Sequence, residues 1–184
     1  MNTLETATIA GGCFWCTEAL FKRLKGVESV EPGYTGGHVE NPSYEDVVGG
    51  DTGHAESIQI KFDPKEIPFK TILEIFMHTH NPTTLNRQDY DEGTQYRSAI
   101  FYHTEEQRKI AEELIDELSE SGDFADPIVT ELTPFSSFYP ADDEHRDYYD
   151  NNKDAPYCRI ITAPKVHKLL KLYGKRVKDG YKTE

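Results

Sequence analysis

The segment GGCFWC, residues 11–16, places two of the three cysteines of a 184-residue chain on either side of its only tryptophan. A cysteine that reacts needs thiolate character and access, whereas a buried structural cysteine behaves as a small hydrophobe. In a reducing compartment, a Cys-x-x-Cys pair with one distant cysteine suggests redox chemistry. Cys13 and Cys16 are therefore the first candidates for chemistry, and Cys158 is the distant thiol.

The residues around this segment predict the elements that would hold it. Residues 3–10 are predicted as a short strand that runs into the glycine pair. Leu20 and Leu24 then recur at helical spacing, and Gly26 ends the predicted helix. Cys13 is therefore expected near the helix N-terminus, where unpaired N–H groups and the helix dipole should help its thiol to ionise.

Phe14 and Trp15 lie between the two cysteines. Adjacent residues of a helix point apart, so both rings cannot be buried on the face of Cys16. One or both are expected to line a pocket next to Cys13. The alternative is that they are ordinary core aromatics.

Glu56 begins the alternating segment ESIQIKF, residues 56–62. It shares parity with Ile58 and Ile60, so its carboxyl should point to the apolar face of the strand. Burial raises the pKa of a carboxyl group and so provides a general acid near neutral pH. The alternative is that the first residue of the strand lies at the sheet edge and stays solvated.

The rest of the chain predicts further strands and helices. A helix begins after Pro68, and a capping box of Thr104 with Gln107 begins an acidic helix that Gly122 ends. The other predictions are strands at 95–103 and 127–135, a long loop with one short helix at 139–157, and a last helix from Pro164. The expected fold is a mixed α+β domain, residues 1–184, with helices packed on a central sheet and an irregular C-terminal segment.

Composition excludes several classes of function. The formal net charge of −13 argues against nucleic acid as a partner, because a polyanion binds a basic face. No apolar run approaches the ~18 residues of a membrane span. The first residues lack the pattern of a secretory signal, so we expect a cytoplasmic protein. Without a second Cys-x-x-Cys, a four-cysteine zinc site is excluded, and no metal site is predicted.

Eight motifs follow one another along the chain: GGCFWCTE, GYTGG, NPSYEDV, GDTGHAE, FDP, GTQYRSAI, YPADDEH and APYC. In this order they resemble the motifs of peptide methionine sulfoxide reductases of the A type, and the resemblance covers residues 7–170. It implies an α+β sandwich related to the ferredoxin-like arrangement. It also implies a thiol enzyme that repairs oxidised proteins. Such an enzyme reduces the S epimer of methionine sulfoxide, free or in proteins, with thioredoxin as reductant and without a metal or organic cofactor.

The resemblance also implies roles for individual residues. Cys13 matches the family nucleophile, which attacks the sulfoxide sulfur as a thiolate and becomes a sulfenic acid. Glu56 matches the glutamate that protonates the sulfoxide oxygen, which agrees with its predicted place on the apolar face. Tyr44 and Tyr96 match two hydroxyl donors to the sulfoxide oxygen. Asp91 matches an acid that positions the substrate, and Phe14 and Trp15 match two rings that enclose the methyl group.

The sequence departs from the family pattern at two places. Position 16 is cysteine where many members have glycine, and Asp89 and Tyr90 replace small or polar residues beside the site, which leaves the peptide preference open. The sulfenic acid needs a second thiol before thioredoxin can recycle it. Cys158 is the first choice, because it matches the family and follows a segment whose composition predicts a mobile loop. Cys16, one helical turn from Cys13, is the alternative.

Two other classes of function remain open on the sequence. The Cys-x-x-Cys pair alone would suit a thiol redox sensor or a thioredoxin-like exchange module, in which the GHAE and GTQYRS motifs have no role. A cysteine hydrolase would instead pair Cys13 with His54. A lone histidine is more often structural.

Overall fold

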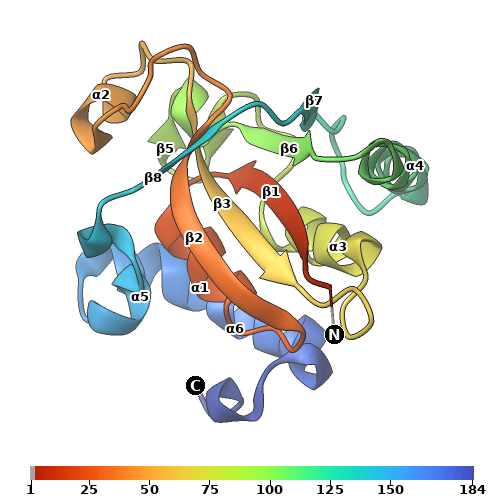
Figure 1. Ribbon diagram of the computed structural model, residues 1–184. Helices are drawn as coiled ribbons and strands as arrows, with labels where there is room; N and C mark the ends of the chain where they lie inside the picture. The colour runs from red at the N-terminus through yellow and green to blue at the C-terminus, as the bar shows by residue number, and fades with distance from the viewer. Residues whose placement is uncertain (1–2) are drawn as a thin grey trace.

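The computed structural model describes residues 3–184 and centres on a six-stranded sheet (Figure 1). The strand order is β7-β6-β1-β3-β2-β8, and neighbours are antiparallel except β6 and β7, which are parallel. In chain order the strands are β1 Glu5–Gly11, β2 Val27–Thr35, β3 Ala55–Phe62, β6 Ser98–Tyr102, β7 Glu131–Pro134 and β8 Phe138–Pro140. A separate hairpin pairs β4 Arg87–Gln88 with β5 Asp91–Glu92. The predicted α+β class is confirmed.

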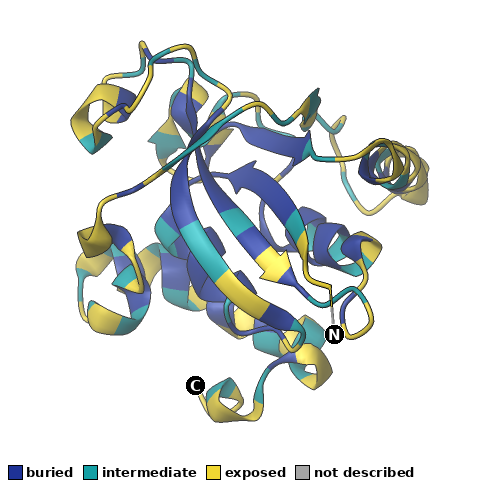
Figure 2. Cartoon of the chain, in the orientation of Figure 1, coloured by how far each residue is buried: buried dark blue, intermediate teal, exposed yellow. Residues whose placement is uncertain are grey.

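Three helices pack against one another over one face of this sheet (Figure 1). The helices are α1 Phe14–Phe21, α2 Tyr44–Val48, α3 Phe69–Thr79, α4 Glu105–Ser121, α5 Tyr148–Asn151 and α6 Ala163–Tyr173, of which α1, α3 and α6 form this layer. Ile9, Ile58 and Ile60 from the strands are fully buried together with Phe76 of α3. Figure 2 shows the same division, with buried central strands and exposed outer elements. Among residues 3–184, no helix has the length and apolar character needed to cross a membrane.

The local patterns that predicted β3 and α4 explain why these elements form. Ile58 and Ile60 of β3 face the helix layer, while Lys61 is exposed. At the start of α4 the Thr104 hydroxyl accepts the Gln107 N–H at 3.1 Å, as a capping box requires. The Gln107 side chain, however, accepts the N–H of His103 rather than that of Thr104, so the box closes one residue early.

The C-terminal segment is more regular than the sequence predicts. It contains β8, a 3-10 turn at Asp143–His145, and α5 where the sequence predicts a loop with one short helix. A π-helical turn, Cys158–Thr162, then leads directly into α6. Cys158 is fully buried in this turn, so the thiol belongs to a packed helix rather than to the mobile loop that composition predicts.

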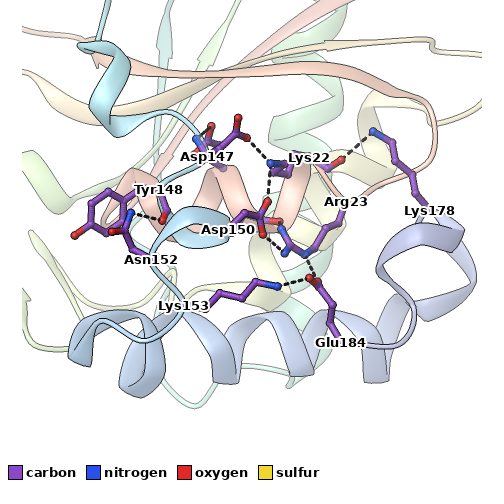
Figure 3. A network of polar contacts seen from close by, with 11 residues as sticks. Lys22, Arg23, Asp147, Tyr148, Asp150, Asn152, Lys153, Lys178 and Glu184 are labelled. Carbon is purple, nitrogen blue, oxygen red and sulfur yellow. Dashed lines mark hydrogen bonds and ion pairs between the residues drawn. The ribbon is translucent and has the colours of Figure 1, made fainter.

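A fully buried arginine ties this segment to α1 (Figure 3). The Arg23 guanidinium donates to Asp150 at 2.6 Å, to Glu184 at 2.8 Å and to the Ala19 carbonyl at 2.7 Å. Lys22 pairs with the same Asp150 at 2.6 Å. A buried cation is stable only when such partners surround it. The network therefore holds both α5 and the last residue of the chain against the helix that begins beside Cys13.

Candidate active site

Cys13 lies between the end of β1 and the start of α1. Gly12 has φ +89°, a left-handed conformation that favours glycine, and it turns the chain from the strand into the helix. The Cys13 carbonyl accepts the Cys16 N–H at 3.1 Å and so begins the helix. The predicted place of Cys13 at a helix N-terminus is confirmed, and its exposed fraction is 8%.

The predicted easy ionisation of Cys13 is wrong for the resting structure. Burial raises the pKa of Cys13, and the hydrogen bond with Cys16 and the charge of Glu56 raise it further, against the opposing Trp15 N–H. The same hydrogen bond from Cys13 lowers the pKa of Cys16 to about 7, with help from the charge of Lys165. Cys13 therefore keeps its proton in the resting structure, and the ionisation of the two thiols is a property of the pair.

Glu56 lies on the apolar face of β3, as its parity predicts, and only 1% of it is exposed. Its Oε2 accepts the Phe14 N–H at 3.1 Å, so the carboxyl faces the first turn of α1 beside Cys13. Burial raises the pKa of Glu56 to about 8, although the Phe14 N–H opposes this. At neutral pH the group is therefore a carboxylic acid with a proton to give.

Three tyrosine hydroxyls surround this carboxyl. Tyr44 begins α2, Tyr96 ends a 3-10 turn, and Tyr34 of β2 is the register partner of Glu56. Burial and the charge of Glu56 raise the pKa of all three phenols, that of Tyr44 to about 12. The Tyr34 hydroxyl has no hydrogen-bond partner among residues 3–184. All three groups are thus hydrogen-bond donors that can face a substrate oxygen.

Asp91 of β5 closes the site from the hairpin side. Its Oδ2 accepts the Tyr157 hydroxyl at 2.7 Å. Burial is the main cause of the raised pKa of Glu56 and of Tyr96, and the charge of Asp91 raises both further. Tyr157 precedes the π-helical turn, and sequence analysis did not select it. Asp91 therefore joins the site to the segment that carries Cys158.

The two aromatic residues after Cys13 take different places. Phe14 is fully buried, so it is a core aromatic whose ring reaches the site 5.7 Å from Tyr34 and 5.3 Å from His145, centroid to centroid. Trp15 is partly exposed and stacks on Tyr148 at 3.8 Å. Its indole N–H donates to His145 Nδ1 at 3.2 Å, so the single N–H of the neutral His145 ring lies on Nε2.

Sequence analysis missed four aromatic residues of this site: Tyr34, His145, Tyr148 and Tyr157. For Tyr34 a signal existed, because GYTGG and GHAE are strand-end motifs that the sheet register brings opposite each other. The other three come from a segment without hydrophobic periodicity, so their position depends on contacts with α1.

Cys16 is the thiol that interacts with each of the other two. All three thiols are free, and Cys16 is hydrogen-bonded to Cys13. The Cys16 sulfur also lies 3.2 Å from the Thr162 hydroxyl. Burial and the charge of Cys16 raise the pKa of Cys158.

The hydrolase pairing of Cys13 with His54 is not formed. His54 Nδ1 accepts the Gly37 N–H at 3.0 Å, and Nε2 bonds to the Val39 carbonyl at 2.7 Å. Both ring nitrogens are thus occupied by a structural turn. Within residues 3–184 there is also no group of three or more His, Cys, Asp or Glu side chains arranged to hold a metal ion.

Comparisons with known proteins agree with this arrangement of residues. The family model of peptide methionine sulfoxide reductase matches residues 5–177. The peptide methionine sulfoxide reductase MsrA of Saccharolobus solfataricus is 59% identical over 175 residues, which cover 95% of this chain and 98% of that protein.

Solved structures are similar as well. Reduced Mxr1 of Saccharomyces cerevisiae has a TM-score of 0.79 and 32% identity, covering 84% of this chain and 89% of that one. Mxr1 in complex with Trx2 has a TM-score of 0.56 and 25% identity, covering 79% and 84%. The chain therefore belongs to the peptide methionine sulfoxide reductase family and is an oxidoreductase.

Proposed function

We propose that this protein reduces the S epimer of methionine sulfoxide, free and in oxidised proteins, and that a thioredoxin recycles it in the cytoplasm. The observation that carries the proposal is the buried carboxyl of Glu56, which accepts the Phe14 N–H beside Cys13. A sulfoxide oxygen leaves only when it is protonated, so reduction needs an acid and a nucleophile at the same S–O group. The complex of Mxr1 with Trx2 supports a thioredoxin-type partner. The whole chain is proposed to act as one domain.

The first step reduces the sulfoxide sulfur and oxidises Cys13 by two electrons. Cys13 gives up its proton and attacks the sulfoxide sulfur as a thiolate, and the released proton later restores the Glu56 carboxyl. Glu56 protonates the sulfoxide oxygen, the S–O bond breaks, and the hydroxyl binds the Cys13 sulfur. The bond between Cys13 and the substrate sulfur then breaks, and its electron pair stays on the methionine sulfur. Methionine and the Cys13 sulfenic acid are the products.

The tyrosines and Asp91 have binding roles in this proposal. Tyr44 and Tyr96 donate hydrogen bonds to the sulfoxide oxygen, where negative charge is concentrated. Asp91 positions the substrate from the hairpin. Phe14 and Trp15 enclose the methyl group, since Phe14 reaches the site from the core and Trp15 from its partly exposed rim.

The contacts among the thiols favour a two-step recycling in which Cys16 acts first. The Cys16 sulfur attacks the sulfur of the Cys13 sulfenic acid, an S–S bond forms, and the hydroxyl leaves as water with the Cys16 proton. Cys158 then attacks the Cys16 sulfur, which releases Cys13 as a thiol. The sequence alone ranks Cys158 first, but the thiol whose charge acts on Cys158 is Cys16.

A small chiral sulfoxide tests the proposed reaction. With dithiothreitol as reductant, the protein is expected to consume only one enantiomer of methyl p-tolyl sulfoxide, because the proposed acid and nucleophile act from one side of the proposed methyl pocket. Chiral chromatography measures both enantiomers in one run. If the protein consumes neither enantiomer, the alternative of a thiol-exchange protein is favoured. If it consumes both enantiomers equally, the proposed fixed geometry of Glu56 and Cys13 is contradicted.

Trp15 should report the first step by its fluorescence. It is the only tryptophan and adjoins Cys13. Adding one equivalent of methionine sulfoxide to the reduced protein is expected to change the emission as Cys13 is oxidised. Cys13→Ser provides the control for binding alone. An unchanged spectrum with methionine formation confirmed would place Trp15 away from the reacting group.

A further inference from the structure

The β4–β5 hairpin contacts the C-terminal segment at two points. Asp91 accepts the Tyr157 hydroxyl at 2.7 Å, and Asp89 pairs with Lys165 at 2.6 Å. The Cys158–Thr162 turn lies between these two anchors. The hairpin therefore fixes both ends of the segment that packs on the thiols.

Lys165 follows Thr162 by three residues, so the two side chains lie on neighbouring parts of one helix face. The Thr162 hydroxyl is 3.2 Å from the Cys16 sulfur. The Lys165 side chain is only 15% exposed, and within residues 3–184 Asp89 is the carboxylate that pairs with it. The Lys165 ammonium is thus held in a partly buried position one helical turn from the hydroxyl that contacts the Cys16 sulfur.

Asp89 adopts a backbone conformation that few side chains accept, with φ +55°. Asp89 therefore gives this hairpin a carboxylate that can fix Lys165.

The charges around Cys16 agree with this geometry. Burial opposes a charge on Lys165, yet Cys16 and Asp89 raise its pKa above the ordinary value. The groups that face Cys16 are Cys13 at the start of α1, Glu56 of β3, Tyr157 and Cys158 of the C-terminal segment, and Lys165 of α6. Lys165 is the only positive charge among them in the part of the chain that the structure describes.

We propose that Lys165, held by Asp89, is a positioning residue that prepares Cys16 for its attack on the Cys13 sulfenic acid. This inference rests on the proposed function. The ammonium favours the Cys16 thiolate, which attacks the Cys13 sulfur. An S–S bond forms, the S–O bond breaks, and the hydroxide leaves as water with the proton that Cys16 released. Because the Lys165 charge acts on the second thiol, Cys16, loss of this charge should leave the first step, methionine formation, unchanged.

Lys165→Met tests the proposal by two measurements. In protein labelled with ¹³C at the cysteine β-carbons, the NMR titration midpoint of Cys16 is expected to rise. After one equivalent of methionine sulfoxide, the Cys13–Cys16 disulfide should form roughly 3- to 10-fold more slowly at pH 7, because a smaller thiolate fraction outweighs its greater nucleophilicity. The difference should vanish above about pH 9, where Cys16 is ionised in both the variant and wild type.

Two further variants separate charge from packing. Lys165→Arg should restore the fast disulfide step, because it keeps the charge. Lys168→Met removes an exposed charge one turn along α6 and should behave as wild type. An unchanged titration midpoint of the Cys16 thiol in Lys165→Met would overturn the proposal. If that variant folds poorly, wild type alone decides, because a Cys16 titration midpoint near the ordinary value of ~8.5 would also overturn the proposal. If wild type forms no methionine, the proposed function itself fails instead.

Discussion

Replacing Glu56 by glutamine is expected to slow methionine formation by ~10²-fold or more, the usual effect of losing a general acid. Glutamine fits the same place and can still accept the Phe14 N–H, but it has no proton to give. Single-turnover kinetics isolate this step from recycling. In wild type the rate should fall above about pH 8, where the pKa of Glu56 lies, and the variant should lack this fall.

The same replacement should make the protein more stable at neutral pH. The folded pKa of Glu56, about 8, lies above its ordinary value of 4.5, so the unfolded chain ionises first as pH rises. The free energy of unfolding therefore falls between about pH 4.5 and pH 8. Glu56→Gln removes this fall. Urea unfolding should show a gain at pH 8 that is absent near pH 4.

Glu18→Gln is the matched control. Glu18 is also buried, burial raises its pKa to about 7, and its Oε1 accepts the Asp147 N–H at 2.9 Å, away from Glu56. This variant should gain stability at neutral pH and form methionine at the wild-type rate. A rate within a factor of about two of wild type for Glu56→Gln, or an equal loss in Glu18→Gln, would remove Glu56 from the role of acid.

The parts of the fold that sequence predicts are those with local causes. The parity of Glu56 with Ile58 and Ile60 places its carboxyl inside because successive strand residues alternate. The left-handed turn at Gly12 and the Thr104 cap are likewise properties of a few neighbouring residues. For the same reason the start of α1 at Cys13 follows from the sequence.

Long-range contacts account for what the sequence does not predict. Arginine side chains are usually exposed, so the sequence alone does not predict that Arg23 is buried. Asp150 and Glu184, which lie far along the chain, form ion pairs with it in the fully buried position. That contact brings Tyr148 over Trp15. The ionisation of Cys13 fails as a prediction for a similar reason. The helix dipole is a local effect, and burial beside Glu56 is larger.

The proposed order of the thiols has a consequence for where a thioredoxin would act. Cys13 and Cys16 are nearly inaccessible, so a disulfide between them lies inside the site. In the proposed cycle, transfer to Cys158 moves the disulfide into the π-helical turn. Cys158 is itself fully buried there, but the turn reaches the surface at Ile160, which is 65% exposed. Helical turns of this kind are rare and often lie at functional sites. Reduction by a partner protein should therefore require Cys158 more than the chemistry at Cys13 does.

Cys16→Ser is expected to form one methionine per enzyme and then lose thioredoxin-dependent turnover, since the sulfenic acid has no neighbouring thiol. Cys158→Ser should also form one methionine, but it should accumulate a Cys13–Cys16 disulfide that dithiothreitol reduces faster than thioredoxin does. Peptide mapping by mass spectrometry identifies each disulfide, and Cys13→Ser provides the background without chemistry. A Cys13–Cys158 disulfide in Cys16→Ser, formed as fast as the wild-type disulfide, would show that Cys158 captures the sulfenic acid directly. In that case the C-terminal turn must open during every cycle, and the proposed order of disulfide exchange, from Cys13 to Cys16 to Cys158, would be wrong.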